Sequence, residues 1–564
     1  MPAEFHQPTA SEREDNLSPW IVIPARGGSV GVPRKNVRMI AGRPLIAYAI
    51  DTSLEVVPSE RLVVITDDEE IADVSRAAGA QVIIEKVPTP AHETLDEKIS
   101  RNLPRLGQLG AAVDDVIITL QPTSPLLRPE TIRDAVSALL GGAKSAITVT
   151  DDRHLRWTMG EDGGAQPLYE RRLNRQQLPP LMRETGGIIA CRYRDIARTR
   201  SRVIPPVALV PVDSGEAVDI DTFEDLYSAA HLLTRLKIAL RADAGKNRGM
   251  GHIYRTLAFA SELARHDIRI YTSRDSTLAQ TFFSRYPFPV HPITTEDQFL
   301  QDLHDWQPDL VVLDVLDTQS DYIRAIRSHN ATGKILTIED LGDGAGEADA
   351  VLSEFVKHPT VPDNKQLFGV ENSILAPAFE TMPIVSQFRP EVEHVLVLFG
   401  GTDPSNLAEK AVASLGRVEF KGKITVVRGL GAEPYPRPTP SNVRVLTNVK
   451  NMPALMASAD LAYTSAGRTI VELASAGVPS ICMAQNHKEL THLHANIHLG
   501  VRMLGHGLEV LDEELDAATA ELLQTPHIRR LYHSSALTTL QNRSNHKTLG
   551  RLLDMLGFDP FPNL

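Results

Sequence analysis

The stretch IVIPARGGSVGVPRKN, residues 21–36, joins a short apolar run to a loop that is rich in glycine and in cations. An apolar run bounded by glycine predicts a buried strand, and open α/β sheets bind ligands in the loop that follows such a strand. Glycine allows backbone N–H groups to converge on an anion, and Arg and Lys side chains neutralise its charge. The spacing fits neither the dinucleotide motif nor a Walker loop. The stretch therefore predicts a nucleotide-phosphate loop of another kind, with a solvated surface turn as the alternative.

Short apolar runs alternate with helical patterns along the chain, as in RLVVITDD (residues 61–68), DVIITLQPTSP (115–125) and SAITVT (145–150). This alternation is typical of βαβ units and of a mostly parallel sheet. The pattern restarts at Lys237 almost without a linker and is interrupted again between Pro383 and Pro390. We therefore expect an α/β fold with one nucleotide-binding Rossmann-like domain followed by a pair of Rossmann-like domains. The expected ranges are 1–18 for a disordered tail, 19–235 for the first domain, 236–385 for the second, and 386–564 for the third with C-terminal helices.

Composition narrows the classes of function. The chain has 564 residues, 42% of them hydrophobic, a formal net charge of -13, and two cysteines. No apolar run approaches the ~20 residues that span a bilayer, and the net negative charge disfavours nucleic-acid binding, which relies on clustered cations. Two cysteines exclude a disulfide framework and a thiolate zinc site. We expect a cytoplasmic homo-oligomer that acts on small-molecule phosphates, without a nucleic-acid or membrane partner.

Two carboxylates near residue 220 predict a metal site. In VDIDT, residues 218–222, a strand would place Asp219 and Asp221 on one face and Ile220 on the other. Magnesium is commonly held by one or two carboxylates together with waters and substrate phosphates. We therefore expect Mg²⁺ as the cofactor. In the alternative interpretation, which does not exclude the first, Asp221 caps the helix that begins at Thr222.

These motifs resemble a known family. IPARGGSVGVPRKN followed by AGRPLIAYAI is similar to the opening motif of the acylneuraminate cytidylyltransferases, the CMP-sialic acid synthetases. Four later stretches match in order: VVITDDEEIADVSRAAGA, LQPTSPLLR, RRLNRQQLPPLMRETGGI and VDIDTFEDL. The resemblance covers residues 19–233. It implies a nucleotidyltransferase domain that transfers CMP from CTP to the anomeric hydroxyl of a nine-carbon 2-keto sugar acid, releases pyrophosphate and uses Mg²⁺.

The resemblance also assigns roles to residues. Asp219 and Asp221 would hold the metal, and Asp221 counts among the catalytic residues. The catalytic cations would be Arg26 and Lys35, and the nucleotide would be positioned by Gly27, Gly28 and Asn36. An amide and two hydroxyls suit a polyol sugar, and a guanidinium recognises a carboxylate in a bidentate manner. These groups would come from Gln121, Thr123, Ser124, Arg175 and Arg183.

The chain departs from the family pattern at two positions. Val30 stands where the family commonly has a lysine, so one cation expected near the phosphates is missing, and Arg34 is a candidate to replace it. Thr185 stands where the family often has asparagine. The first departure concerns the triphosphate, and the second leaves the identity of the sugar open.

The second part of the chain again places a glycine-rich turn before a helix, in RADAGKNRGMGHIYR, residues 241–255. A helix N-terminus disfavours imidazolium, so His252 at this position is expected to be neutral and able to accept a proton. Two further glycine-containing loops could hold a diphosphate at helix N-termini. Their residues are Gly400, Gly401, Ser465, Ala466 and Gly467, and Glu472 would accept a hydrogen bond from a ribose hydroxyl.

Residues 236–545 resemble the UDP-sugar hydrolase of the pseudaminic acid pathway and its spore-coat relatives, which have the glycosyltransferase-B fold. The matching stretches are GMGHIYR, LDVLD, IEDLGD, GGTDPSN and TSAGRTIVELASAGVPS. The resemblance implies a UDP-sugar ligand, and it implies that His252 activates the water that displaces UDP from C1, without a metal. The whole chain is then expected to be a bifunctional enzyme of nonulosonic acid biosynthesis. A glycosyltransferase and a non-catalytic nucleotide-sugar-binding module stay open as alternatives for the second part.

Overall fold

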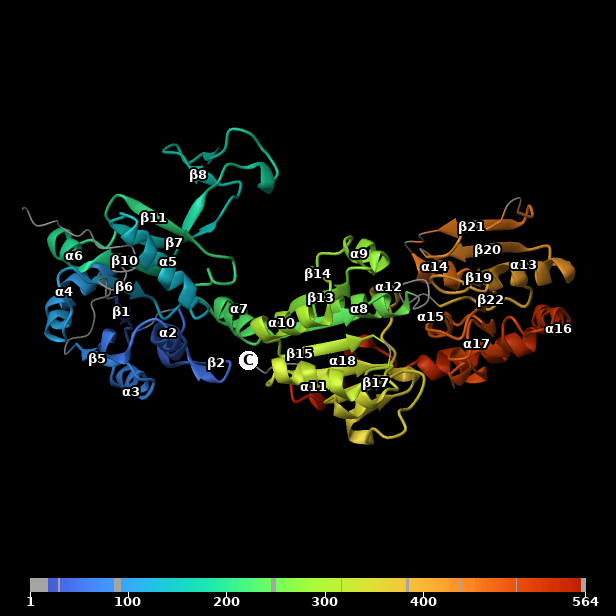
Figure 1. The fold of residues 1–564 in the computed structure, drawn as a ribbon. Helices are drawn as coiled ribbons and strands as arrows, with labels where there is room; N and C mark the ends of the chain where they lie inside the picture. Colours follow the sequence, from blue (N-terminus) through green and yellow to red (C-terminus); the bar gives the residue numbers. More distant parts are fainter. Residues whose placement is uncertain are drawn as a thin grey trace, which may run out of the picture. The chain divides into compact units, whose positions relative to one another are not determined.

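The chain forms two compact units that divide between Thr234 and Arg235, one residue before the boundary expected from the sequence. Figure 1 shows the elements of each unit in the computed structural model. The expected disordered tail and Val30 lie outside the residues that the structure describes. These residues are 19–28, 31–85, 93–244, 250–315, 317–381, 385–429, 431–436, 439–447, 449, 451–492 and 494–558.

The first unit is built on a seven-stranded sheet with the order β11-β7-β10-β6-β1-β4-β5. Its central part is parallel, and β10 runs antiparallel between β6 and β7 with a register shift between Glu184 and Ile189. The strands are β1 (Pro19–Pro24), β4 (Leu62–Thr66), β5 (Gln81–Ile84), β6 (Val116–Leu120), β7 (Ser145–Asp151), β10 (Met182–Arg192) and β11 (Val207–Pro211).

The apolar run that opens the sequence is β1, and both of its faces are covered. Ile21 and Ile23 pack in one hydrophobic cluster, whereas Val22 packs in another on the opposite face. A strand buried on both faces has to be continuously apolar, which explains the run. The helices that cover the sheet are α2 (Leu45–Leu54), α3 (Glu69–Ala77), α4 (Leu95–Gln108), α5 (Pro129–Leu140) and α6 (Tyr193–Thr199), and α7 (Phe223–Leu233) packs beside α2 and β2.

Two small hairpins extend from this core. One pairs β2 (Met39–Ile40) with β3 (Arg43–Pro44), and the other pairs β8 (Trp157–Met159) with β9 (Ala165–Pro167). The second hairpin stands away from the main sheet of its unit, as Figure 1 shows. All six residues of its two strands are exposed.

The second unit contains two entirely parallel sheets, with the orders β14-β13-β12-β15-β16-β17-β18 and β21-β20-β19-β22-β23-β24. The expected α/β fold with a pair of Rossmann-like halves is confirmed. The first sheet comprises β12 (Lys237–Ala242), β13 (Asp267–Ser273), β14 (Val290–Ile293), β15 (Leu310–Asp314), β16 (Lys334–Ile338), β17 (Ala350–Ser353) and β18 (Gln366–Phe368). The second comprises β19 (His394–Leu398), β20 (Lys423–Arg428), β21 (Val443–Thr447), β22 (Leu461–Thr464), β23 (Ser480–Ala484) and β24 (Val501–His506).

In each sheet of the second unit the strand order reverses beside one strand. β12 lies between β13 and β15, and β19 lies between β20 and β22. Ligands of open α/β sheets bind at such switch points, outside the carboxyl ends of the strands. The helices are α8 (Gly251–Glu262), α9 (Thr277–Phe283), α10 (Glu296–Trp306), α11 (Ser320–His329), α12 (Pro377–Thr381), α13 (Leu407–Arg417), α14 (Met452–Ala457), α15 (Thr469–Ser475), α16 (Asp512–Gln524), α17 (Pro526–Leu540) and α18 (Asn545–Met555). Among the described residues, no helix is both long and apolar enough to cross a bilayer.

The last helix returns to the first half of the second unit. Leu549 and Leu552 of α18 pack in the hydrophobic cluster that contains Ile238 and Leu240 of β12. The range 386–564, expected to form the last domain, therefore includes a helix that completes the core of the preceding one. At the start of α18, the fully buried side chain of Asn545 accepts a hydrogen bond from the Leu375 N–H (2.9 Å) and donates one to the Leu375 carbonyl (2.8 Å).

Replacing Asn545 by Ala tests this junction. The change leaves the buried N–H and carbonyl of Leu375 without their partner, so we expect a loss of about 2–4 kcal/mol in the free energy of unfolding. Urea unfolding followed by circular dichroism measures it. The same substitution at the exposed Asn542 is the control and should change stability by no more than about 0.5 kcal/mol. Equal stability of the two variants would show that the Asn545 contacts contribute little.

Candidate active sites

The predicted phosphate loop of the first unit is tied to the VDIDT segment. The ammonium group of Lys35 donates to the Ile220 carbonyl oxygen (2.5 Å) and forms an ion pair with Asp221 (3.1 Å). Asn36 donates from its side-chain amide to the carbonyl of Arg26 (3.0 Å), which closes the loop on itself. The structure thus brings the Lys35 side chain, the backbone of Arg26 and the predicted metal ligand Asp221 to one edge of the sheet.

Two glycines of the loop lie close to other backbone or side-chain groups. A Cβ at Gly31 would lie 2.2 Å from the carbonyl oxygen of Asp221, so a larger residue would push the loop away from the carboxylates. The N–H of Gly27 donates to Asp67 (2.9 Å), which follows β4. Gly28 is exposed. Arg34, the candidate replacement for the missing lysine, forms an exposed ion pair with Glu70.

The VDIDT segment is not a strand, and that expectation was wrong. Within this segment, only the Ile220 N–H forms a hydrogen bond of the kind that pairs strands, and it donates to the Thr123 carbonyl (2.9 Å). The chain then turns into α7, because the side chains of Thr222 and Asp225 cap the helix reciprocally. The alternative role of Asp221 as the cap is therefore also wrong. Asp221 stays largely exposed, with 75% of its side chain accessible.

The Asp219 carboxyl group is suited to a hard cation. Its Oδ1 atom is buried and has no hydrogen-bond partner within the described part of the chain. Burial raises the pKa of Asp219, Asp221 adds to this effect, and Thr123 and Lys35 act against it. A cation at this oxygen would satisfy the acceptor and favour the ionised carboxylate, so the residues present fit Mg²⁺. Across the described residues, no cluster of three or more His, Cys, Asp or Glu side chains is arranged to hold a metal ion unaided.

The predicted sugar-binding loop follows β6 and packs beside the carboxylates. Gln121 donates from its side chain to the carbonyl of Gly186 (2.8 Å), which adopts a φ of 76° in the left-handed region. The hydroxyl of Thr123 is buried beside Asp219. The buried hydroxyl of Ser124 and the buried Asn36 Oδ1 have no partner among the residues that the structure describes. Such unsatisfied buried groups indicate a place for a polar ligand.

A cavity of about 440 Å³ lies next to this loop. Arg183 and both predicted metal ligands line it, together with Asp151 and Asp152, which the sequence analysis missed. The sequence could have revealed this pair, because both residues directly follow the buried run SAITVT. Arg183 lies 4.0 Å from Asp152. Arg175, in a 3-10 turn (Arg175–Gln177), is exposed and does not line the cavity.

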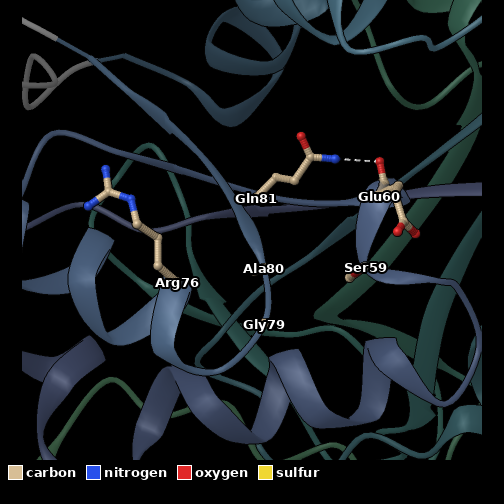
Figure 2. Close-up of a pocket in the computed structure, with 6 residues that line it drawn as sticks. All are labelled: Ser59, Glu60, Arg76, Gly79, Ala80 and Gln81. Carbon is tan, nitrogen blue, oxygen red and sulfur yellow. Dashed lines mark hydrogen bonds between the residues drawn. The ribbon is translucent and has the colours of Figure 1, made fainter.

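Thr185, one of the two departures from the family pattern, is buried. Its hydroxyl is 2.8 Å from that of Thr148 on the neighbouring strand. Figure 2 shows a second pocket of the unit, a surface depression of about 220 Å³ on the side of α3 and β5. None of the predicted site residues lines this pocket. Its lining residues are Ser59, Glu60, Arg76, Gly79, Ala80 and Gln81.

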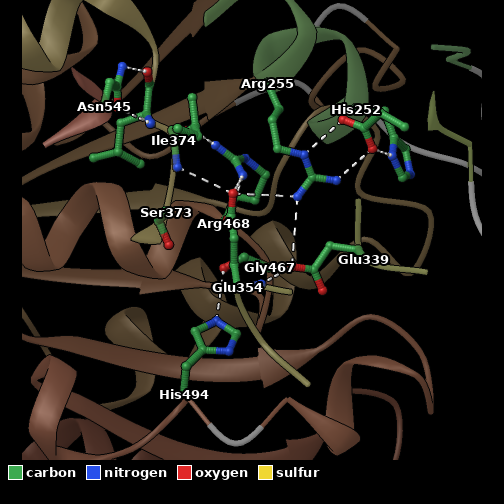
Figure 3. A network of polar contacts seen from close by, with 12 residues as sticks. His252, Arg255, Glu339, Glu354, Ser373, Ile374, Gly467, Arg468, His494 and Asn545 are labelled. Carbon is green, nitrogen blue, oxygen red and sulfur yellow. Dashed lines mark hydrogen bonds and ion pairs between the residues drawn. The ribbon is translucent and has the colours of Figure 1, made fainter. Parts of the chain in front are cut away.

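In the second unit, His252 lies in the first turn of α8 and is oriented by a buried carboxylate. Its Nδ1 atom is 2.6 Å from Asp314, the last residue of β15, and Arg255 donates to the same carboxylate at 2.8 and 2.6 Å (Figure 3). Burial opposes ionisation of Asp314, but Arg255 and His252 together hold its pKa well below the usual range. An ionised carboxylate only accepts hydrogen bonds, so Nδ1 carries the hydrogen and Nε2 is left to accept a proton.

The predicted anion loops meet the turn before α8. Gly400 adopts a φ of 73°, and a Cβ at Gly401 would lie 2.4 Å from Cγ of Met250. A Cβ at Gly251 would lie 3.5 Å from Cδ of Arg468, the residue before α15. Loops from both halves of the unit therefore converge beside His252.

A carboxylate of the chain itself accepts a hydrogen bond from the second predicted anion loop, residues 465–467. The Ala466 N–H donates to Glu489 (3.2 Å), which also accepts from the Gln485 N–H (2.8 Å). Sequence reasoning missed Glu489, whose pKa is raised by burial. The hydroxyl-bearing Ser465 is buried in the same loop. The Gly467 carbonyl is reached by His494 at 3.5 Å.

The predicted ribose-binding residue Glu472 lies on α15 beside the ion pairs at the start of α8. Burial raises its pKa, Arg468 acts against this, and Glu354 adds to it. A hydrogen bond from a ribose hydroxyl to Glu472 stays a prediction.

At the edge of its sheet, the first unit combines a glycine-rich phosphate loop with a carboxylate pair, and this fold and site define a nucleotidyltransferase. A family model described as Cytidylyltransferase matches residues 20–158. The CMP-N,N'-diacetyllegionaminic acid synthase of Legionella pneumophila is 32% identical over 209 residues, which are 36% of this chain and 90% of that relative. The chain belongs to the cytidylyltransferase family.

The second unit has relatives of a different kind. The spore coat polysaccharide biosynthesis protein SpsG of Bacillus subtilis is 23% identical over 335 residues, 57% of this chain and 98% of that relative. A solved structure of the glycotransferase of kitacinnamycin is 15% identical and aligns over 57% of this chain and 97% of its own, with a TM-score of 0.40. Two parallel Rossmann-like sheets with a returning C-terminal helix give this unit a glycosyltransferase-B-like architecture.

Replacing Gly31 by Ala tests whether the phosphate loop must touch the carboxylate segment. The added methyl group would meet a backbone oxygen, so the loop must move, and we expect cytidylyl transfer to fall by about 10²-fold, the scale of a 1 Å misplacement. Pyrophosphate release measures it. Gly107→Ala in α4, where a Cβ has ordinary contacts, is the control. Full activity of the Gly31 variant would contradict the positioning role of this contact.

Proposed function

We propose that the chain is a bifunctional enzyme of nonulosonic acid biosynthesis whose first unit transfers CMP from CTP to a nine-carbon 2-keto sugar acid and releases pyrophosphate. The observation that carries this is the Lys35 contact, which joins the phosphate loop to the Asp219 and Asp221 segment beside a cavity that contains Arg183. The Legionella relative is a CMP-N,N'-diacetyllegionaminic acid synthase, which supports this substrate class.

Each group of the site has a chemical task in this reaction. Asp219 and Asp221 would hold Mg²⁺, which supplies charge neutralisation at the triphosphate when bound. Arg26 and Lys35 would neutralise the oxygens of the leaving pyrophosphate. Arg183 would bind the substrate carboxylate through its two-pronged guanidinium.

The acceptor hydroxyl must be held in line with the reacting phosphorus atom. Gln121, Thr123 and Ser124 would bind the polyol, and the Ser124 hydroxyl has no hydrogen-bond partner among the described residues. The acceptor oxygen forms a bond to the α-phosphorus, the bond to the pyrophosphate oxygen breaks, and the acceptor proton is lost to solvent or a nearby base. Positioning of this kind supplies much of the rate in phosphoryl transfer.

Replacing Asp221 by Asn tests the metal assignment. The amide keeps the size of the side chain and removes its charge, so we expect cytidylyl transfer to fall by about 10²-fold or more, because metal stabilisation amounts to several kcal/mol. The Mg²⁺ concentration for half-maximal rate should rise. Glu224→Gln, an exposed neighbour on α7, controls for the lost charge. An unchanged Mg²⁺ dependence in the Asp221 variant would remove this residue from the metal site.

For the second unit, the proposal is hydrolysis of a UDP-linked amino sugar. The observation that carries it is the Asp314-oriented imidazole at the meeting point of the two halves. His252 would take a proton at Nε2 from a water molecule whose oxygen bonds to C1 of the sugar. The bond between C1 and the UDP oxygen breaks, and UDP leaves with the electron pair. Asp314 would stabilise the imidazolium that forms.

A glycosyltransferase is the second candidate, because the architecture of two halves is glycosyltransferase-B-like. The two reactions differ in product, since hydrolysis yields the free sugar and transfer yields a glycoside only when an acceptor is present. A module that only binds a nucleotide sugar would yield neither. Product analysis with and without a carbohydrate acceptor separates the three.

Replacing Asp314 by Asn tests the role of the buried carboxylate. The amide removes the negative charge that orients and stabilises the protonated imidazole, so we expect UDP release to fall by about 10²- to 10⁴-fold. Coupled detection of UDP measures it, with Asp321→Asn as the control, since 95% of that side chain is exposed. A normal rate in the Asp314 variant would mean that the carboxylate does not assist proton transfer by the imidazole.

A further inference from the structure

A buried ionic network links His252 to the second half of its unit. Arg255 pairs with Asp314 and lies 3.9 Å from Glu339 and 3.6 Å from Glu354. Arg468 holds Glu354 by two contacts of 2.6 Å (Figure 3). Arg468 also donates to the carbonyl of Ile374. The two guanidinium groups are therefore each committed to one closely paired carboxylate.

Glu339 is held in this network by an unusual backbone. It directly follows β16 and adopts a φ of 54°, a left-handed conformation that is unfavourable for a residue other than glycine. The neighbouring Asp340 anchors the turn, because its carboxylate accepts from the N–H (2.9 Å) and hydroxyl (2.6 Å) of Thr318. Such conformations persist where the surrounding structure enforces them, and they cluster at functional sites.

The side chain of Glu339 lies at the edge of the network. It accepts a hydrogen bond from the Glu354 N–H, and 17% of it is exposed, whereas the side chain of Glu354 is fully buried. Protons can therefore reach Glu339 from solvent. The charged groups that face it are Arg255 on α8, Glu354 after β17 and Arg468 before α15.

The charges of the network do not balance. Arg255 and Arg468 are matched by their close partners Asp314 and Glu354, which leaves Glu339 and Glu472 as surplus carboxyl groups. Burial raises the pKa of Glu339 to about 7, with Arg255 acting against this shift and Glu354 adding to it. Glu339 therefore keeps its proton to a higher pH than an ordinary glutamate does.

We propose that Glu339 is a second proton-linked residue of the hydrolytic site, which controls through Arg255 and Asp314 how readily His252 accepts a proton. The inference rests on the proposed hydrolysis for its catalytic meaning, and it makes Glu339 a positioning residue. An ionised Glu339 offsets the positive charge that appears when His252 is protonated, and a protonated Glu339 does not. Catalysis on the acid side then requires two deprotonated groups.

The first test follows the His252 imidazole in the full-length chain. Histidine labelled with ¹³C at Cε1 is titrated by NMR, and the His252 signal is assigned by its loss in His252→Gln. We expect the signal to move in two steps in the natural protein and to lose the step of Glu339 in Glu339→Gln, whose amide oxygen can still accept from the Glu354 N–H. Glu347→Gln, a surface residue paired with Arg324, should keep both steps.

A second variant keeps the proposal testable if Glu339→Gln does not fold. Glu339→Asp keeps the charge on a residue type that tolerates a left-handed backbone, and it should keep both steps. Identical titration curves in the natural protein and in folded Glu339→Gln would overturn the inference. Loss of the second step in Glu339→Asp as well would also overturn it, because the shape of the side chain rather than its charge would then be responsible.

The pH dependence of UDP release gives the second test. On the acid side, the logarithm of the rate should fall with a slope near 2 in the natural protein and near 1 in Glu339→Gln. A uniform loss of rate with an unchanged slope would assign Glu339 a purely structural role and overturn the inference. Absence of UDP release in the natural protein, together with the expected NMR coupling, would refute the hydrolase proposal and leave the coupling established.

Discussion

Parallel strands bring their carboxyl ends to one edge of a sheet, and this constraint places the candidate site residues of both units. In the first unit the phosphate loop follows β1 and the polar Gln121 loop follows β6. In the second, Asp314 ends β15 and Glu339 follows β16. The loops at such an edge have to be fixed against each other, which Lys35 does through the Ile220 carbonyl. Residues far apart in the sequence thereby reach hydrogen-bonding distance.

The negative charges of the site carboxylates are compensated differently in the two units. In the first, Asp219 keeps an oxygen without a hydrogen-bond partner among the described residues, which leaves an acceptor for the cation that we propose there. In the second, Asp314 and Glu354 are neutralised by arginines of the chain itself. The first arrangement suits chemistry on a triphosphate, whose own charge requires a metal. The second suits proton transfer, because fixed guanidinium groups set the charge around a titrating imidazole.

The sequence was informative wherever a local pattern determines the structure. The apolar run before the phosphate loop predicted a buried strand, which β1 confirms, and the placement of His252 at a helix start was confirmed. The strand over VDIDT was wrong because the Thr222 capping box turns the chain into a helix. Glu489 and Glu339 were missed, since their roles arise from contacts with loops distant in the sequence. Periodicity and short motifs do not contain that information.

Identification of the product decides whether the first unit transfers CMP from CTP to a nine-carbon 2-keto sugar acid. The full-length chain is incubated with CTP, Mg²⁺ and a panel of nine-carbon 2-keto sugar acids, and the products are analysed by mass spectrometry. We expect a CMP-linked sugar acid and one equivalent of pyrophosphate with at least one of these acids, and loss of both products when the metal is chelated. Binding of CTP without a CMP-linked product from any acid of the panel would contradict it.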